Sequence, residues 1–208
     1  MRATRFAALL LLAGSIAAPA IAQGPTPPPA SQPPLGPSPA TPPAQAAQHT
    51  FSSNELLNSG HRFFGGVSQG LAQVIEKAVS QWGLPNGYIL GEEAGGALIA
   101  GLRYGEGVLY TKNAGDHRVF WQGPSIGFDA GGAGSRTMML VYKLPAAEAI
   151  FDRFGGIDGS AYFIAGFGMT ALAANNIVIV PIRTGVGLRF GANIGYLKFT
   201  PRPTWNPL

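Results

Sequence analysis

Cysteine is absent from this chain of 208 residues, which carries only three histidines and 12% charged residues. Without cysteine the chain can form neither a disulfide nor a thiolate metal site, so packing alone must hold its folded part together. His49, His61 and His117 lack the short spacings that place metal ligands on one face, so no metal or other cofactor is expected. Basic residues form no clustered run, and a nucleic-acid partner is not expected either.

A long hydrophobic run is also missing at the N-terminus. Residues 6–12 are apolar, but a typical membrane-spanning helix needs about 20 such residues. Arg2 and Arg5 precede this segment and a small-x-small site at residues 20–22 follows it, which is typical of a secretory signal peptide. We expect residues 1–22 to direct export to the periplasm, with cleavage after about Ala22 and no integral membrane span afterwards. An uncleaved N-terminal anchor is the alternative.

Proline is plentiful only in the next segment, residues 23–48. Ten of the 25 residues from 24 to 48 are proline, with Ala, Gln, Ser and Thr between them. This composition favours solvated polyproline II and buries too little apolar surface to fold. At about 3.1 Å per residue it could reach about 75 Å. We interpret it as a disordered linker, the alternative being a docking site for a proline-binding partner. One folded domain, residues 49–208, remains.

Helical patterns are few in this domain. Ser52–Glu55 offers capping residues, which predict a short helix that begins there. A longer helix is predicted over Val67–Gln81, because its apolar residues recur on one face and a glycine and a proline follow it. We expect it to cover one side or the mouth of a sheet, the alternative being a helix that lies on a membrane surface. A short inserted helix is predicted at Ala146–Phe154, after a proline.

From Tyr88 onward, short strand patterns alternate with turn signals such as Asn113–Asp116 and Asp158-Gly159. The glycines inside the strands favour the kinks that strong curvature requires. The pattern predicts a mainly β (α+β) domain, built as a small, strongly curved antiparallel β-barrel-like sheet. The predicted strands are Tyr88–Leu90, Ala97–Tyr104, Gly107–Lys112, Val119–Trp121, Ser125–Ala130, Arg136–Tyr142, Ser160–Ala174, Ile177–Leu188 and Ala192–Phe199.

Alternation along Ile177–Phe190 divides that segment into two faces. One face is apolar and is expected to be core. The other carries Arg183 and Arg189 with glycines between them, and we expect a flat, open surface with two guanidinium groups. Ser160–Ala174 differs because its residues are small or apolar on both faces, so we expect it to be buried on both sides or to line an apolar cavity.

Catalytic motifs are weak. Gly123–Gly127 reads G-x-S-x-G, the nucleophile elbow, which requires a helix after its serine and, in hydrolases, a later histidine. The residues after Ser125 are poor helix formers, and all three histidines precede it. Glu92 and Glu93 are adjacent on a predicted strand, so they point to opposite faces and cannot act directly as a carboxylate pair. We therefore predict that the protein is not an enzyme.

Several motifs resemble a known family. PIRTGVGLR at 181–189, GYLK at 195–198, TWNP at 204–207 and FGGIDGSA at 154–161 resemble the EipA envelope-integrity family of Gram-negative bacteria, over roughly residues 49–208. GLRYGEGVL at 101–109 and GFDAGGAG at 127–134 are similar, more weakly, to the SYLF lipid-binding domain. The first resemblance implies a periplasmic, non-enzymatic protein with a small β-barrel-like fold that supports envelope integrity. The second suggests lipid binding.

Three arginines are the candidate contacts for a phospholipid or other amphiphile: Arg103, Arg183 and Arg189. Guanidinium groups pair bidentately with phosphate. Arg103 joins the other two because GLRYG at 101–105 recurs as GLRFG at 187–191. Ordinary solvated charges on strands are the alternative reading of these residues. For the whole protein, the alternatives to lipid binding are a scaffold that binds an envelope protein or cell-wall partner, and an outer-membrane β-barrel.

Overall fold

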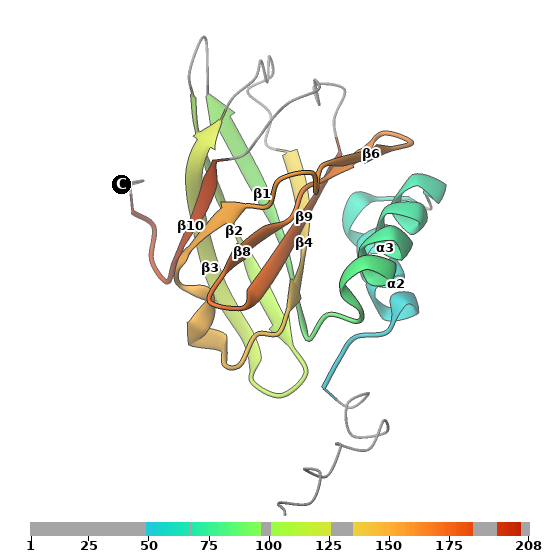
Figure 1. Cartoon of the computed structure of the whole chain (residues 1–208), viewed down its shortest axis with the longest axis horizontal. Helices are drawn as coiled ribbons and strands as arrows, with labels where there is room; N and C mark the ends of the chain where they lie inside the picture. The colour runs from blue at the N-terminus through green and yellow to red at the C-terminus, as the bar shows by residue number, and fades with distance from the viewer. Residues whose placement is uncertain (1–48, 67, 97–100, 126–134, 185–194, 205–208) are drawn as a thin grey trace, which may run out of the picture. The chain divides into compact units, whose positions relative to one another are not determined.

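The computed structural model of the chain describes residues 49–66, 68–96, 101–125, 135–184 and 195–204 (Figure 1). The predicted signal peptide and linker lie outside these residues. Two helices come first, α2 (Ser53–Phe64) and α3 (Gln69–Trp82). Ser52 and Glu55 form a reciprocal capping box at the start of α2, and Ser68 caps α3. Both predicted helices are thus confirmed. No helix in the described part of the chain is long and apolar enough to cross a membrane.

The strands form one antiparallel sheet that closes into an eight-stranded barrel in the order β4-β1-β2-β3-β10-β5-β8-β9, with β9 pairing back to β4. A further hairpin, β6–β7, attaches to β9. This architecture confirms the predicted fold class. The strands are β1 (Gly87–Gly96), β2 (Gly101–Thr111), β3 (Gly115–Ser125), β4 (Ser135–Tyr142), β5 (Arg153–Gly156), β6 (Tyr162–Ile164), β7 (Phe167–Met169), β8 (Leu172–Ala174), β9 (Ile177–Thr184) and β10 (Tyr196–Thr200), and a 3-10 helix, η1 (Ala147–Ile150), follows β4.

Some predicted strand boundaries are wrong. Ser160–Ala174 is three short strands, because Ala165 and Gly166 both adopt positive φ and turn the chain between β6 and β7. It is not buried on both sides either, since Phe163 is 57% exposed. The two strands predicted around Gly105 are one strand, β2, which runs through its glycines without a turn. The inserted helix is shorter than predicted and is confined to η1.

The inside of the barrel is filled by side chains, as expected for eight strands. Its apolar part lies toward the end where β4 finishes and η1 begins. Residues of η1 itself pack into it, so this end of the barrel is filled by the chain that connects β4 to β5. The interior core consists of Ile89, Leu109, Val119, Trp121, Met139, Val141, Leu144, Ala147, Ile150, Phe154, Leu172, Ile177, Ile179, Leu197 and Phe199.

The outer face of β1, β4, β7 and β9 carries a second apolar layer, which α2 and α3 cover (Figure 1). The two faces of these strands are therefore both buried, one by the barrel and one by the helices. The covered layer consists of Phe51, Leu56, Leu71, Val74, Ile75, Ala78, Tyr88, Met138, Leu140, Tyr142, Phe167, Met169, Ala171, Val180 and Ile182.

Candidate functional site

The interior becomes polar toward the other end of β1. Ile89 and Glu93 are four residues apart and therefore face the same way, into the barrel. Glu93 is only 6% exposed, whereas the neighbouring Glu92 is exposed. The two carboxylates thus lie on opposite faces, as the alternation predicts. A buried carboxylate is costly unless charged or hydrogen-bonding partners surround it.

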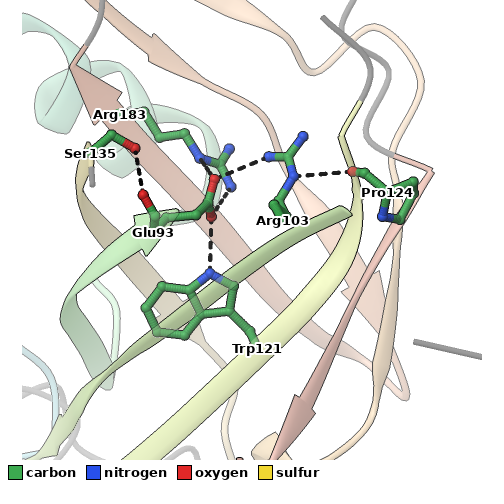
Figure 2. Close-up of polar contacts among 6 residues, drawn as sticks. All are labelled: Glu93, Arg103, Trp121, Pro124, Ser135 and Arg183. Atoms are coloured by element: carbon green, nitrogen blue, oxygen red, sulfur yellow. Dashed lines mark hydrogen bonds and ion pairs between the residues drawn. The ribbon is translucent and has the colours of Figure 1, made fainter. Parts of the chain in front are cut away.

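Four donors from three strands supply those partners (Figure 2). Arg183 on β9 donates from Nε to Glu93 Oε1 at 3.2 Å and from Nη2 to Oε2 at 3.1 Å. Arg103 on β2 donates from Nη1 to Oε1 at 3.4 Å, and Trp121 on β3 donates from its indole Nε1 to Oε2 at 2.9 Å. These four bonds occupy the acceptor capacity of one carboxylate. We call Glu93, Arg103, Trp121 and Arg183 the Glu93 cluster.

Glycines position the tryptophan of this cluster. In the strand register, Gly105 lies between Glu93 on β1 and Trp121 on β3. A Cβ atom at Gly105 would overlap the indole ring, and one at Gly91 would lie 2.7 Å from Trp121 Cη2. The ring therefore lies directly over the bare backbone of two neighbouring strands. This arrangement fixes the indole N–H against Glu93, and it gives the glycines within β1 and β2 a steric reason.

The two arginines are buried with Glu93. Their side chains are 9% exposed for Arg103 and 11% exposed for Arg183. Arg103 also donates from Nε to the Pro124 carbonyl at 3.1 Å. The expected open Gly/Arg surface is therefore wrong at Arg183. Pairing of β9 with β4 closes the barrel and turns the Arg183 face of β9 inward. Arg189 lies outside the described residues.

In the Glu93 cluster two guanidinium groups face one carboxylate. Burial on its own would raise the pKa of Glu93, but the charges of Arg183 and Arg103, and hydrogen bonds from Arg183 and Trp121, outweigh it and hold that pKa below 4.5. Glu93 is therefore ionised at neutral pH and keeps its ion pairs with both arginines.

Two further polar groups lie beside Arg183 on the same inner wall. The hydrogen bonds from Arg183 to Glu93 use Nε and Nη2. The third guanidinium nitrogen, Nη1, has no acceptor among the described residues. Thr137 on β4 is the register partner of Arg183 and is completely buried. Its Oγ1 has no hydrogen-bond partner in the described part of the chain.

The sequence thus points to two of the residues that meet here but misses their centre. Arg103 and Arg183 were predicted as contacts, and the fold brings them together from strands that are not neighbours in the sheet. Glu93 was not predicted to have a role. The available signal was its spacing from Ile89, which places a carboxylate on the core face of β1 and requires cationic partners inside the barrel.

Comparisons with known proteins agree with this architecture. Residues 49–208 match the model of the family described as envelope integrity protein A. The crystal structure of a β-barrel-like, uncharacterised protein from Brucella abortus is 61% identical in sequence and superposes with a TM-score of 0.72, covering 77% of this chain and 99% of that one. No curated protein matches the chain.

Proposed function

The chain belongs to the envelope integrity protein A family, and we propose that it supports the cell envelope from the periplasm as a non-enzymatic binding protein. The proposed ligand is a phospholipid or another amphiphile with an anionic head group. The secretory pattern of residues 1–22 and the weaker likeness to a lipid-binding domain support this assignment.

The observation that carries the proposal is the Arg183 side chain of the Glu93 cluster. Its Nε and Nη2 bind Glu93, and its Nη1 has no acceptor among the described residues. Here two arginines surround one carboxylate inside the barrel wall. An anionic head group would bind the remaining edge of Arg183, because guanidinium groups suit phosphate and carboxylate particularly well.

Native mass spectrometry of the full-length protein, purified from its own envelope without detergent, tests this function. We expect a co-purified amphiphile that is lost on denaturation and regained when anionic phospholipid is titrated into the refolded protein. The matched comparison is zwitterionic phospholipid, which should bind more weakly. Finding neither a co-purified nor a titratable lipid would refute the proposal.

A scaffolding role with an envelope protein or cell-wall partner is the second candidate, and the β6–β7 hairpin favours it. Phe163 is the most exposed large hydrophobic side chain in the described part of the chain, at 57%. Among the described strands, β6 pairs with β7 alone, so it presents an edge to which an extended segment could add. A photo-crosslinker in place of Phe163 in living cells would give one dominant protein adduct and no lipid adduct if this role is correct.

A further inference from the structure

Arg183 presents an unused edge. Its side-on edge, Nε and Nη2, binds Glu93, and the described residues offer Nη1 no acceptor. A guanidinium carries five N–H donors in one plane, so the end-on edge formed by Nη1 and Nη2 can still bind a second oxyanion. The side chain as a whole keeps 11% of its surface exposed.

Small residues flank Arg183 on the two adjacent strands. On one side Arg183 pairs with Thr137 of β4, and on the other with Gly168 of β7, which has no side chain to compete for the guanidinium. Partners in register on adjacent strands project to the same face, so the Thr137 hydroxyl lies on the inner wall beside Arg183. This hydroxyl is fully buried without a hydrogen-bond partner among the described residues. Buried hydroxyls nearly always have a partner.

We propose that the barrel binds an oxyanion, the phosphate or carboxylate group of its ligand, between the end-on edge of Arg183 and the hydroxyl of Thr137. The bound oxygen atoms accept from Nη1 and Nη2 of Arg183 and from Oγ1 of Thr137, while Glu93 holds the other edge of the guanidinium in place. The identity of the ligand as an amphiphile rests on the proposed function, but the oxyanion subsite does not.

Substitution of Thr137 separates a ligand contact from a structural one. Thr137→Val removes only the hydroxyl and keeps the shape of the side chain, and Thr137→Ser retains the hydroxyl. Thr111→Val is the matched control, because the hydroxyl of Thr111 is satisfied locally by the Ala114 N–H and the Gly115 carbonyl at the opposite end of the barrel. The protein without its signal peptide is titrated with inorganic phosphate by calorimetry. Its co-sedimentation with vesicles of phosphatidylglycerol or of phosphatidylcholine is measured separately.

We expect Thr137→Val to weaken binding of the anionic probe about tenfold, with Thr137→Ser and Thr111→Val close to the wild type. Its midpoint of thermal unfolding should be unchanged or higher, because an unpaired hydroxyl is removed. If the binding of inorganic phosphate weakens in Thr137→Val, a free anion is sufficient for the subsite. If only the binding of phosphatidylglycerol vesicles weakens, the subsite requires a lipid head group. Either result supports the subsite.

Three results would overturn it. Anionic probes that bind wild type and Thr137→Val equally would refute the subsite and leave amphiphile binding intact, whereas no binding of either probe to the wild type would refute both. A marked fall in the unfolding midpoint of Thr137→Val, without a loss of binding, would show that the hydroxyl serves the fold.

Discussion

The two faces of β4 are buried in different ways. Its outward residues, among them Met138 and Tyr142, lie in the apolar layer under α2 and α3. Its inward residues begin with Thr137 beside Arg183 and continue with Met139 in the interior core. Burial alone therefore does not distinguish the two faces. The covered layer contributes stability through apolar contact. The inner face of β4, at Thr137, instead adjoins the ionised side chains of the Glu93 cluster on β1, β2 and β9, and buried charges of this kind are stable only when they are paired.

This difference predicts different responses to substitution. In the covered layer, each fully buried aliphatic or aromatic side chain contributes about 1.5–3 kcal/mol, and a smaller apolar replacement leaves the rest of the layer in place. In the Glu93 cluster, removing one partner leaves the others charged in a medium of low dielectric constant. The inner face should therefore be the more sensitive to changes of charge, and the outer face to changes of volume.

The largest effect is expected for Glu93→Gln. It keeps the size of the side chain but leaves Arg103 and Arg183 without their shared carboxylate. We expect a loss of about 3–5 kcal/mol in the free energy of unfolding, because the penalty is that of uncompensated buried charge. Urea denaturation followed by circular dichroism at neutral pH measures it.

Glu92→Gln is the matched control, since Glu92 is the adjacent residue on the same strand and is exposed. It should change the free energy of unfolding by less than about 0.5 kcal/mol. Similar values for the two variants would mean that the Glu93 cluster is not an energetically coupled unit, and the contrast between the two faces would fail.

A steric effect of about 1–3 kcal/mol is expected for Gly105→Ala, because its methyl group would overlap the Trp121 indole, which must then leave its place against Glu93. Gly155→Ala on β5 is the control, as a Cβ there meets no neighbouring atom within 4 Å. Chemical denaturation compares the two. Equal stability would show that the indole moves freely and that the glycine has no packing role.

Much of the fold follows from local signals in the sequence. The capping box at Ser52 and the apolar face of α3 are short-range patterns; the first predicts where α2 begins, and the second predicts both ends of α3 to within about two residues. Many short strands and in-strand glycines predict a curved sheet. The boundaries within Ser160–Ala174 escaped prediction because a turn at Ala165-Gly166 can form without the Asn or Asp that usually marks one.

The site depends on closure of the barrel, which local patterns do not encode. Alternation along β9 correctly separates Arg183 from Val180 and Ile182, but it cannot say which face is inside when both are covered. Only the pairing of β4 with β9 turns Arg183 toward Glu93, 90 residues away in the chain. A prediction from alternation therefore identifies the arginine and misplaces it on the surface.

In the covered layer, one substitution is expected to raise the free energy of unfolding by a smaller amount, whereas the substitutions above lower it. The Tyr142 hydroxyl is buried without a hydrogen-bond partner among the described residues, and this burial raises the pKa of the phenol well above its usual value. Tyr142→Phe removes the unpaired group and should stabilise the protein by about 1 kcal/mol. For a chain of this size, scanning calorimetry should show a rise of about 2–4 °C in the unfolding midpoint. A lower midpoint would mean that the hydroxyl has a partner and that the layer is not purely apolar.

The smallest effect is expected at an exposed ion pair. A hydrogen bond from Lys112, followed by those from Ser52, lowers the pKa of Glu55 from 4.5 to about 2. Because the folded-state pKa is the lower one, the stabilisation is present above pH 4.5 and is lost as the pH falls toward 2. Glu55→Gln keeps a capping side chain and should cost less than about 1 kcal/mol at pH 7, since solvent screens the pair.

Urea denaturation of wild type and Glu55→Gln at pH 7, 4.5 and 3 measures this dependence. The difference between them should shrink at pH 3, and added salt should reduce it at pH 7. A cost as large as that of Glu93→Gln would contradict the contrast on which these predictions depend, because an exposed carboxylate with a cationic neighbour would then matter as much as a buried one. A small, salt-sensitive cost at Glu55 beside a large one at Glu93 would instead locate the essential electrostatics of this protein inside the barrel.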